Sequence, residues 1–290
     1  MAENSSVVEV RGLSHTYLAG TPLETKALYE VYLEVREGET VGIIGPSGSG
    51  KSTLLYHLNG LFRPQQGEVR LFGLSMKDPG IAMKEIRKRV GFVFQNPENQ
   101  LFERYAGDDV AFGPRNLGLS LSEVRERVRI AMEMVGLPFS YKDRLVAGLS
   151  TGEKRRIAIA GVLAMDPEML VLDEPTASLD PAVKRDLFGI IDRWKKGHSR
   201  SAVIVSHSME DIVELSDRIY VLARGTVLLS GLPKQVFAHP DILIECGLAL
   251  PIPALVLQKL RREGFPVRTG IFTEEACARE IEVLFDAKEV

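Results

Sequence analysis

The stretch TVGIIGPSGSGKSTLLYHLNGL, from Thr40 to Leu61, joins three local patterns without interruption. It starts with a short apolar run, typical of a strand that is buried on both faces of a parallel sheet. A segment rich in glycine and serine comes next, and a helical pattern follows it directly. The middle segment has the spacing G-x-x-x-x-G-K-[ST], in which successive backbone N–H groups can point at phosphate oxygens. The stretch therefore predicts a strand, a phosphate-binding loop and a helix.

The chemistry of this loop is that of nucleotide binding. Glycine permits the tight backbone turn, and the helix that follows presents its N-terminus to the same anion. Lys51 can reach the β- and γ-phosphates, and the Ser52 hydroxyl can hold Mg²⁺. The candidate ATP-binding residues in the loop are Gly45, Pro46, Ser47, Gly48, Ser49, Gly50, Lys51, Ser52 and Thr53.

A second acidic site is needed beside such a loop, and MLVLDE (169–174) provides it. Four apolar residues predict a buried strand, and two carboxylates follow at its C-terminal end, the edge where open α/β sheets bind ligands. We expect Asp173 to contribute to the Mg²⁺ shell, because Mg²⁺ takes oxygen ligands. We expect Glu174 to orient and deprotonate the attacking water.

The rest of the chain alternates strand and helix patterns, which favours an α/β fold of the P-loop NTPase type. Alternating segments near the start predict an antiparallel β part beside a RecA-like parallel sheet. A helical subdomain is expected at about 97–165, inside a nucleotide-binding domain that spans 1–230. A small α/β appendage is expected at 231–290. Its apolar stripe, formed by Cys277, Ile281 and Leu284 or Phe285, is expected to pack on its own core or to form a subunit interface.

The stretch LSTGEKRR (149–156) departs from local rules. Ser150 and Glu153 form a capping box that starts a helix, as Ser120 and Glu123 do earlier in the chain. Three cations at 154–156 then crowd the positive end of the helix dipole, where acidic residues are preferred. We expect this cationic helix start to face an anion.

Composition sets broad limits on function. The 290 residues are 45% apolar and 26% charged with a net charge of −3, so no global field favours nucleic acid. No apolar run is long enough to cross a bilayer, and the N-terminus has no secretory pattern. The two cysteines, Cys246 and Cys277, lack metal-ligand spacing and are expected to be reduced packing residues.

Taken together and in order, the motifs over about 7–231 resemble those of ABC ATPases. Besides the phosphate loop and MLVLDE, Tyr17 matches the aromatic residue that stacks on adenine, and Gln95 matches the Q-loop glutamine. LSTGE resembles the LSGGQ signature. ASLD (177–180) resembles the D-loop, and Ser206-His207 resembles the H-loop with its switch histidine.

The resemblance implies a mechanism. Two cassettes pair head to tail, so that Ser150, Gly152 and Glu153 of one chain contact the ATP that is held by the other. It also implies Mg²⁺ held by Ser52, Gln95 and Asp173, and in-line attack of water on ATP with Glu174, His207 and Lys51 as catalytic residues. Thr151 replaces the first glycine of the signature and brings a β-branched side chain next to the phosphate. The resemblance therefore does not assign a phosphate contact to Thr151 itself.

Further segments, among them YLAGTPLETKAL, HLNGL and FQNPENQLFE, resemble the ATPases of energy-coupling-factor (ECF) transporters. Two types of ATPase pair in such transporters, and this chain is more similar to the second type. This implies a peripheral protein on the cytoplasmic face of the cell membrane. Its partners would be a second ABC ATPase (identical or a paralogue), an integral membrane coupling subunit and a small membrane subunit that binds a vitamin or a transition-metal ion. The alternatives are the ATPase of another ABC transporter and an ABC ATPase without a transport role.

Overall fold

The computed structural model describes residues 5–177 and 179–286 of the chain, and it builds them around two sheets. The larger sheet has the order β10-β9-β3-β8-β7-β6, and all its neighbours pair in parallel except β9 and β10. Its strands are β3 (Thr40–Ile44), β6 (Val90–Val93), β7 (Met169–Asp173), β8 (Ser201–Val205), β9 (Arg218–Ala223) and β10 (Thr226–Gly231). The predicted α/β class is confirmed.

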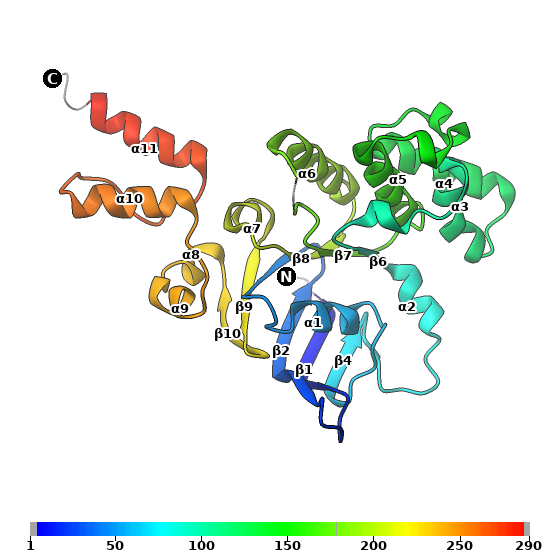
Figure 1. The fold of residues 1–290 in the computed structure, drawn as a ribbon, viewed down its shortest axis with the longest axis horizontal. Helices are drawn as coiled ribbons and strands as arrows, with labels where there is room; N and C mark the ends of the chain where they lie inside the picture. Colours follow the sequence, from blue (N-terminus) through cyan, green and yellow to red (C-terminus); the bar gives the residue numbers. More distant parts are fainter. Residues whose placement is uncertain (1–4, 178, 287–290) are drawn as a thin grey trace.

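The smaller sheet is antiparallel, as predicted, with the order β2-β1-β4-β5. It consists of β1 (Ser6–Tyr17), β2 (Thr25–Arg36), β4 (Gln66–Leu71) and β5 (Leu74–Ser75). Helix α1 (Lys51–Leu58) lies against it, and both share one buried core with the large sheet (Figure 1). Leu54 and Leu55 of α1 are fully buried in this core, which fixes the helix that follows the phosphate loop.

A helical region connects β6 to β7 and is drawn in green in Figure 1. Both predicted capping boxes are present, at Ser120 with Glu123 and at Ser150 with Glu153. Helix α2 precedes β6, and the region itself contains three α-helices and three short 3₁₀ turns among its described residues. These elements are α2 (Met83–Arg89), η1 (Pro97–Gln100), α3 (Ala106–Asn116), α4 (Leu121–Met134), η2 (Phe139–Asp143), η3 (Val146–Gly148) and α5 (Thr151–Leu163).

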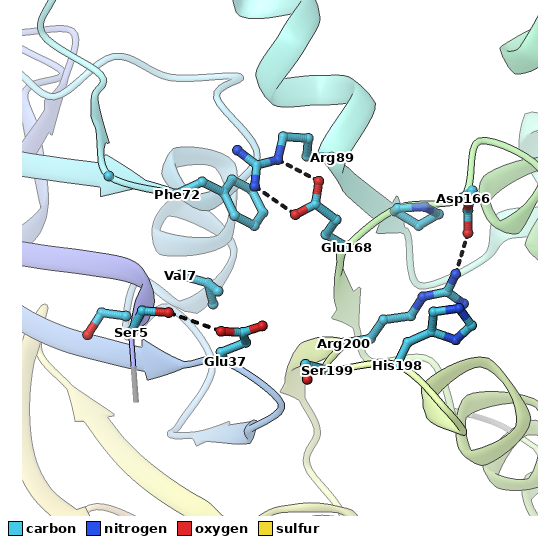
Figure 2. A pocket seen from close by; sticks show the side chains of 13 residues that line it. Ser5, Val7, Glu37, Phe72, Arg89, Asp166, Glu168, His198, Ser199 and Arg200 are labelled. Carbon is cyan, nitrogen blue, oxygen red and sulfur yellow. Dashed lines mark hydrogen bonds and ion pairs between the residues drawn. The ribbon is translucent and has the colours of Figure 1, made fainter. Parts of the chain in front are cut away.

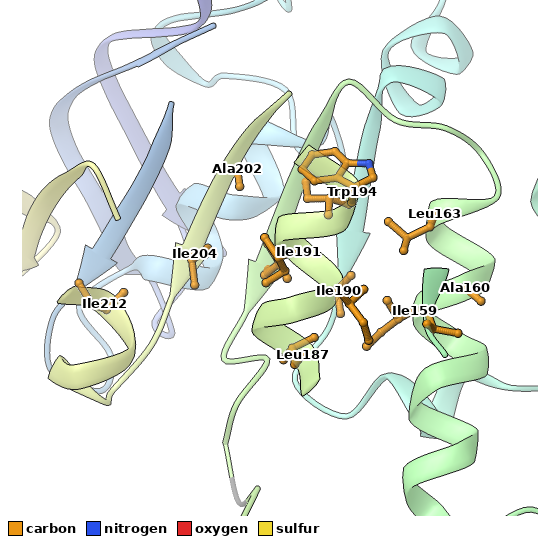
Figure 3. Packing of buried hydrophobic residues seen from close by; sticks show 14 of the residues in the cluster. Ile159, Ala160, Leu163, Leu187, Ile190, Ile191, Trp194, Ala202, Ile204 and Ile212 are labelled. Atoms are coloured by element: carbon orange, nitrogen blue, oxygen red, sulfur yellow. The ribbon is translucent and has the colours of Figure 1, made fainter. Parts of the chain in front are cut away.

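Helix α6 (Pro181–Lys195) joins the helical region to the large sheet (Figure 3). Its apolar face buries Leu187, Ile191 and Trp194, each at most 4% exposed, among side chains of β8 and α5. Helix α7 (Met209–Leu215) covers the same core beside β3. The predicted α/β alternation therefore closes into one continuous core around the sheet.

The C-terminal segment differs from the prediction in one respect. Its described residues form α8 (Pro233–Val236), α9 (Pro240–Glu245), α10 (Ile252–Arg262) and α11 (Glu274–Asp286), and no strand, so the expected α/β appendage is helical. Proline lies in the first turn of three of these helices. Its fixed φ favours a helix start there, and its missing N–H costs nothing because backbone N–H groups in the first turn have no partner within the helix. The predicted stripe of Cys277, Ile281 and Leu284 packs into a small separate core with α10.

None of the described helices is both long and apolar enough to span a membrane.

Candidate nucleotide-binding site

The phosphate loop lies between the end of β3 and the start of α1, and its glycines are required by close contacts. A Cβ on Gly45 would lie 2.0 Å from the backbone oxygen of Leu222. Gly50 has a φ of 101°, and a Cβ there would lie 2.4 Å from the backbone oxygen of Ala27. The loop can take this path only with glycine at both ends.

Lys51 is held inside the loop by backbone oxygens. Its Nζ donates to the carbonyls of Gly45 (2.7 Å) and Pro46 (2.9 Å), and the residue is only 6% exposed. Burial lowers the pKa of Lys51, while the nearby carboxylates of Glu174 and Asp173 act in the opposite direction. A buried cation over a glycine-rich turn is well suited to a polyanionic phosphate chain.

The donor set also fits Mg²⁺ and a nucleotide phosphate. Asp173, at the C-terminal end of β7, accepts a hydrogen bond from the Ser52 side chain, so the two predicted ligands are neighbours. Burial raises the pKa of Asp173, and a bound cation would relieve the cost of its charge. The Ser49 hydroxyl is buried and has no hydrogen-bond partner within the described residues. Such an orphaned donor is expected where a ligand oxygen belongs.

Three predicted residues meet at Glu174. Its carboxylate lies 2.7 Å from Nε2 of His207 and accepts a hydrogen bond from Nε2 of Gln95 at 3.2 Å. The three residues follow β6, β7 and β8, neighbouring parallel strands whose carboxyl ends share one edge. Glu174 itself has a φ of 48°, which is uncommon for a residue with a side chain and marks a backbone held by its surroundings.

Tyr17 lies at the end of β1, next to α1. Its hydroxyl is 3.0 Å from Oγ1 of Thr53, two residues after the loop lysine. The structure thus brings the expected adenine-stacking residue to the P-loop helix. It also shows two residues that the sequence reasoning missed: the ring of His15 packs beside Tyr17, and the ring of His57 packs against His15. The only sequence signal for them was that His15 precedes Tyr17 by two positions on one strand.

The signature segment makes no hydrogen bond or ion pair with the phosphate loop in the part of the chain that the structure describes. Ser150 and Glu153 bond to each other, with Ser150 Oγ 2.8 Å from the carboxylate of Glu153, and Arg144 lies 3.6 Å from that carboxylate. Gly152 has open space around it, because a Cβ there would meet nothing within 4 Å. This chain's own fold therefore does not require glycine at position 152.

The helix start was expected to face an anion, and two of its three cations are paired with carboxylates of the same chain. Arg155 forms a buried ion pair with Glu98 of η1 at 3.1 Å, and Arg156 pairs with Asp186 of α6. These partners lie 57 and 30 residues away, so no local pattern could reveal them. Of the three, only Lys154 has no partner among the described residues.

The other candidate segment, 177–180, is described except for Ser178, which lies outside the described residues. Asp180 caps α6 by accepting a hydrogen bond from the backbone N–H of Val183 at 3.1 Å. This is a structural role in the helix.

A cavity of about 600 Å³ lies at the opposite, amino-terminal edge of β6, β7 and β8 (Figure 2). Both of its arginines are paired with carboxylates: Arg89 makes two hydrogen bonds of 2.7 Å to Glu168, and Arg200 pairs with Asp166. Because these charges are already neutralised, the cavity is a weaker candidate for a phosphate ligand than the loop at the carboxyl edge.

A family model described as ABC transporter matches residues 28–177, more than half of the chain. The chain belongs to the ABC transporter family. Energy-coupling factor transporter ATP-binding protein EcfA2 of Clostridium tetani is 44% identical over 282 residues, which cover 97% of this ABC ATPase and 98% of that protein. EcfA2 of Symbiobacterium thermophilum is 46% identical over 267 residues, 92% of each chain.

Solved structures agree with this family. The chain resembles cbiO1 from Clostridium perfringens, part of the ABC transporter complex cbiONQ, with a TM-score of 0.73 and 33% identity over 89% of this chain and 97% of that one. It also resembles the ATP-binding cassette MJ0796 in a dimeric post-hydrolysis state with ADP and Pi. The TM-score is 0.69, at 29% identity over 78% of this chain and 98% of that one. The resemblance to ECF-type ABC ATPases is confirmed.

Proposed function

We propose that this ABC ATPase binds ATP with Mg²⁺ at the phosphate loop and hydrolyses it to drive uptake by an ECF-type importer. The observation that carries the proposal is the meeting of Gln95, Glu174 and His207 beside the loop that holds Lys51. A carboxylate with two orienting neighbours at the ligand edge of the sheet is the arrangement that water activation needs.

In the proposed reaction, a water oxygen attacks the γ-phosphorus while the bond from that phosphorus to the leaving oxygen of ADP breaks. The proton of the water passes to the carboxylate of Glu174, and the products are ADP and inorganic phosphate. His207 and Gln95 hold Glu174 and the water in line, and Lys51 stabilises charge on the phosphates. Ser52, Asp173 and Gln95 would hold Mg²⁺, which neutralises phosphate charge.

Replacing Glu174 with Gln tests the base assignment. The amide keeps the shape and one of the two acceptor oxygens but cannot take up the proton, so we expect turnover to fall by about 10²–10⁴-fold. ATP affinity should remain near that of the unchanged chain. Glu245→Gln is the matched control, because Glu245 is exposed on α9 and remote from the site. An unchanged steady-state ATPase rate in the Glu174 variant would refute the assignment.

We also propose that the site is completed by a second ATPase, either an identical chain or a paralogue. Within the described residues, Ser150, Gly152 and Glu153 make no hydrogen bond or ion pair with the phosphate loop of their own chain, and a Cβ on Gly152 would meet nothing within 4 Å. Glycine would suit the approach of a phosphate that is held by a partner, because without a Cβ it lets the phosphate come close to the backbone N–H. Hydrolysis would then weaken the interface between the two chains.

The proposed membrane partners are an integral coupling subunit and a small substrate-binding subunit, with this chain peripheral on the cytoplasmic face. An apolar patch supports docking: Phe102 is 63% exposed, Phe112 is 44% exposed, and their rings lie 4.8 Å apart next to the segment after Gln95.

We propose α10 and α11 as a further contact with the second ATPase. Leu255 and Val283 are exposed there, beside the small C-terminal core.

Purification of the full chain from detergent-solubilised native membranes, followed by mass spectrometry, tests the transport assignment. A multi-span protein and a small membrane protein should accompany the chain, and the small protein would point to the substrate class. Recovery only in the soluble fraction, without a membrane protein, would refute the transport role and leave the ATPase proposal standing.

A further inference from the structure

Four rings form a compact cluster at the end of β1. The ring of His15 meets the ring of Tyr17 edge-on, with centroids 4.6 Å apart, and lies flat against Phe62 at 5.0 Å and 4°. His57, on α1, meets both His15 (5.1 Å) and Phe62 (5.7 Å) edge-on. These offset and edge-on geometries are the favourable ones for aromatic pairs. The cluster therefore supports Tyr17 from the side of α1.

The backbone of β1 is irregular where it carries Tyr17. The pairing with β2 shifts register on both sides of His15, and the pairing with β4 shifts between Arg11 and Ser14. The side chain of Gln65 bonds to both backbone groups of Thr16, at 2.7 Å and 3.0 Å. A regular ladder would fix the direction of each side chain, but here that direction depends more on side-chain packing.

A hydrogen bond inside the cluster ties the strand to the helix. Nε2 of His57 lies 3.2 Å from Nδ1 of His15, and the two residues are 0% and 7% exposed. Between neutral imidazoles this contact needs one N–H and one lone pair, so the tautomer of each ring depends on the other. With the hydroxyl of Tyr17 on Thr53, the Tyr17 ring is connected to α1 at two points.

We infer that His57 is a positioning residue for the nucleotide base: through His15 it sets the ring plane of Tyr17 relative to the phosphate loop at the start of the same helix. The inference rests on the proposed ATP-binding function and on Tyr17 as the ring that stacks on adenine. The base is remote from the reacting phosphate, so stacking acts equally on bound substrate and transition state. Loss of the positioning should therefore raise KM and leave kcat nearly unchanged.

The test compares His57→Phe, which keeps a buried ring and removes the hydrogen bond, with the unchanged chain on two substrates. For ATP we expect KM to rise about tenfold, within the range that base stacking on an aromatic side chain supplies. For ribose 5-triphosphate, which has no base, we expect the same KM in both proteins. His57→Gln should fall closer to the unchanged chain, because its amide can still donate to His15. His198→Phe is the control, since His198 is exposed and far from the cluster.

Each outcome separates the inference from the function on which it rests. An unchanged KM for ATP, or an equal rise for both substrates, would overturn the positioning role. Absence of ATP hydrolysis by the unchanged chain would instead refute the proposed function. If His57→Phe does not fold, His15→Phe breaks the same hydrogen bond while keeping a ring against Tyr17. The same selective rise in KM for ATP is then expected.

Discussion

Because His57 is buried, we expect the free energy of unfolding of the chain to decrease at mildly acidic pH. The pKa of His57 falls from 6.5 to about 4, because the side chain is buried away from water and because His15 lies beside it, while the backbone of Phe62 acts in the opposite direction. The folded state therefore resists protonation that the unfolded state accepts. Below pH 6.5 the unfolded chain binds more protons at this residue, so the free energy of unfolding decreases as the pH falls.

The size of the effect follows from the shift. Each pKa unit corresponds to about 1.4 kcal/mol, so His57 should remove about 2 kcal/mol of stability between pH 7.5 and pH 5, and about 3 kcal/mol once the pH nears 4. Above pH 6.5 both states are neutral and the effect vanishes. Burial also lowers the pKa of His15. The unchanged chain therefore loses somewhat more stability on acidification than His57 alone accounts for.

Urea unfolding at pH 7.5 and pH 5 measures the effect, with His57→Phe as the comparison and His198→Phe as the control. Carboxylates that titrate in this range contribute alike to all three proteins. The unchanged chain and the control should lose about 2 kcal/mol more than His57→Phe on acidification. Equal losses in the three proteins would mean that His57 accepts a proton as easily in the folded state as in water, and would refute the reasoning from burial.

Three further predictions concern single contacts. Glu98→Gln leaves Arg155 buried without a carboxylate, so the free energy of unfolding in urea should fall by about 3 kcal/mol. Glu126→Gln, at an exposed ion pair with Arg129, should leave it nearly unchanged. Gly45→Ala places a methyl group 2.0 Å from a backbone oxygen and should abolish ATP binding in calorimetry, while Gly148→Ala, which meets nothing, should not. Gly152→Ala should leave folding and monomer ATP affinity unchanged and reduce turnover of the dimer; normal turnover would contradict a composite site.

The catalytic cluster shows how far sequence reasoning reached. Each of Gln95, Glu174 and His207 was proposed from a motif, and the structure brings the three side chains within hydrogen-bond distance. The prediction worked because each residue lies within two positions of the end of a buried strand, and neighbouring parallel strands have their carboxyl ends at one edge of the sheet. Strand order itself, with β8 between β3 and β7, required the folded chain.

The sequence by itself determined the phosphate loop, the acidic strand end, both capping boxes and the α/β class, because each depends on spacing over a few residues that backbone geometry converts directly into shape. Only the tertiary structure decided that Arg155 pairs with Glu98, that His15 meets His57, and that the C-terminal segment is helical throughout its described residues. The two side-chain contacts join positions tens of residues apart. Such contacts are selected by the packing of whole elements, and local spacing carries no information about them.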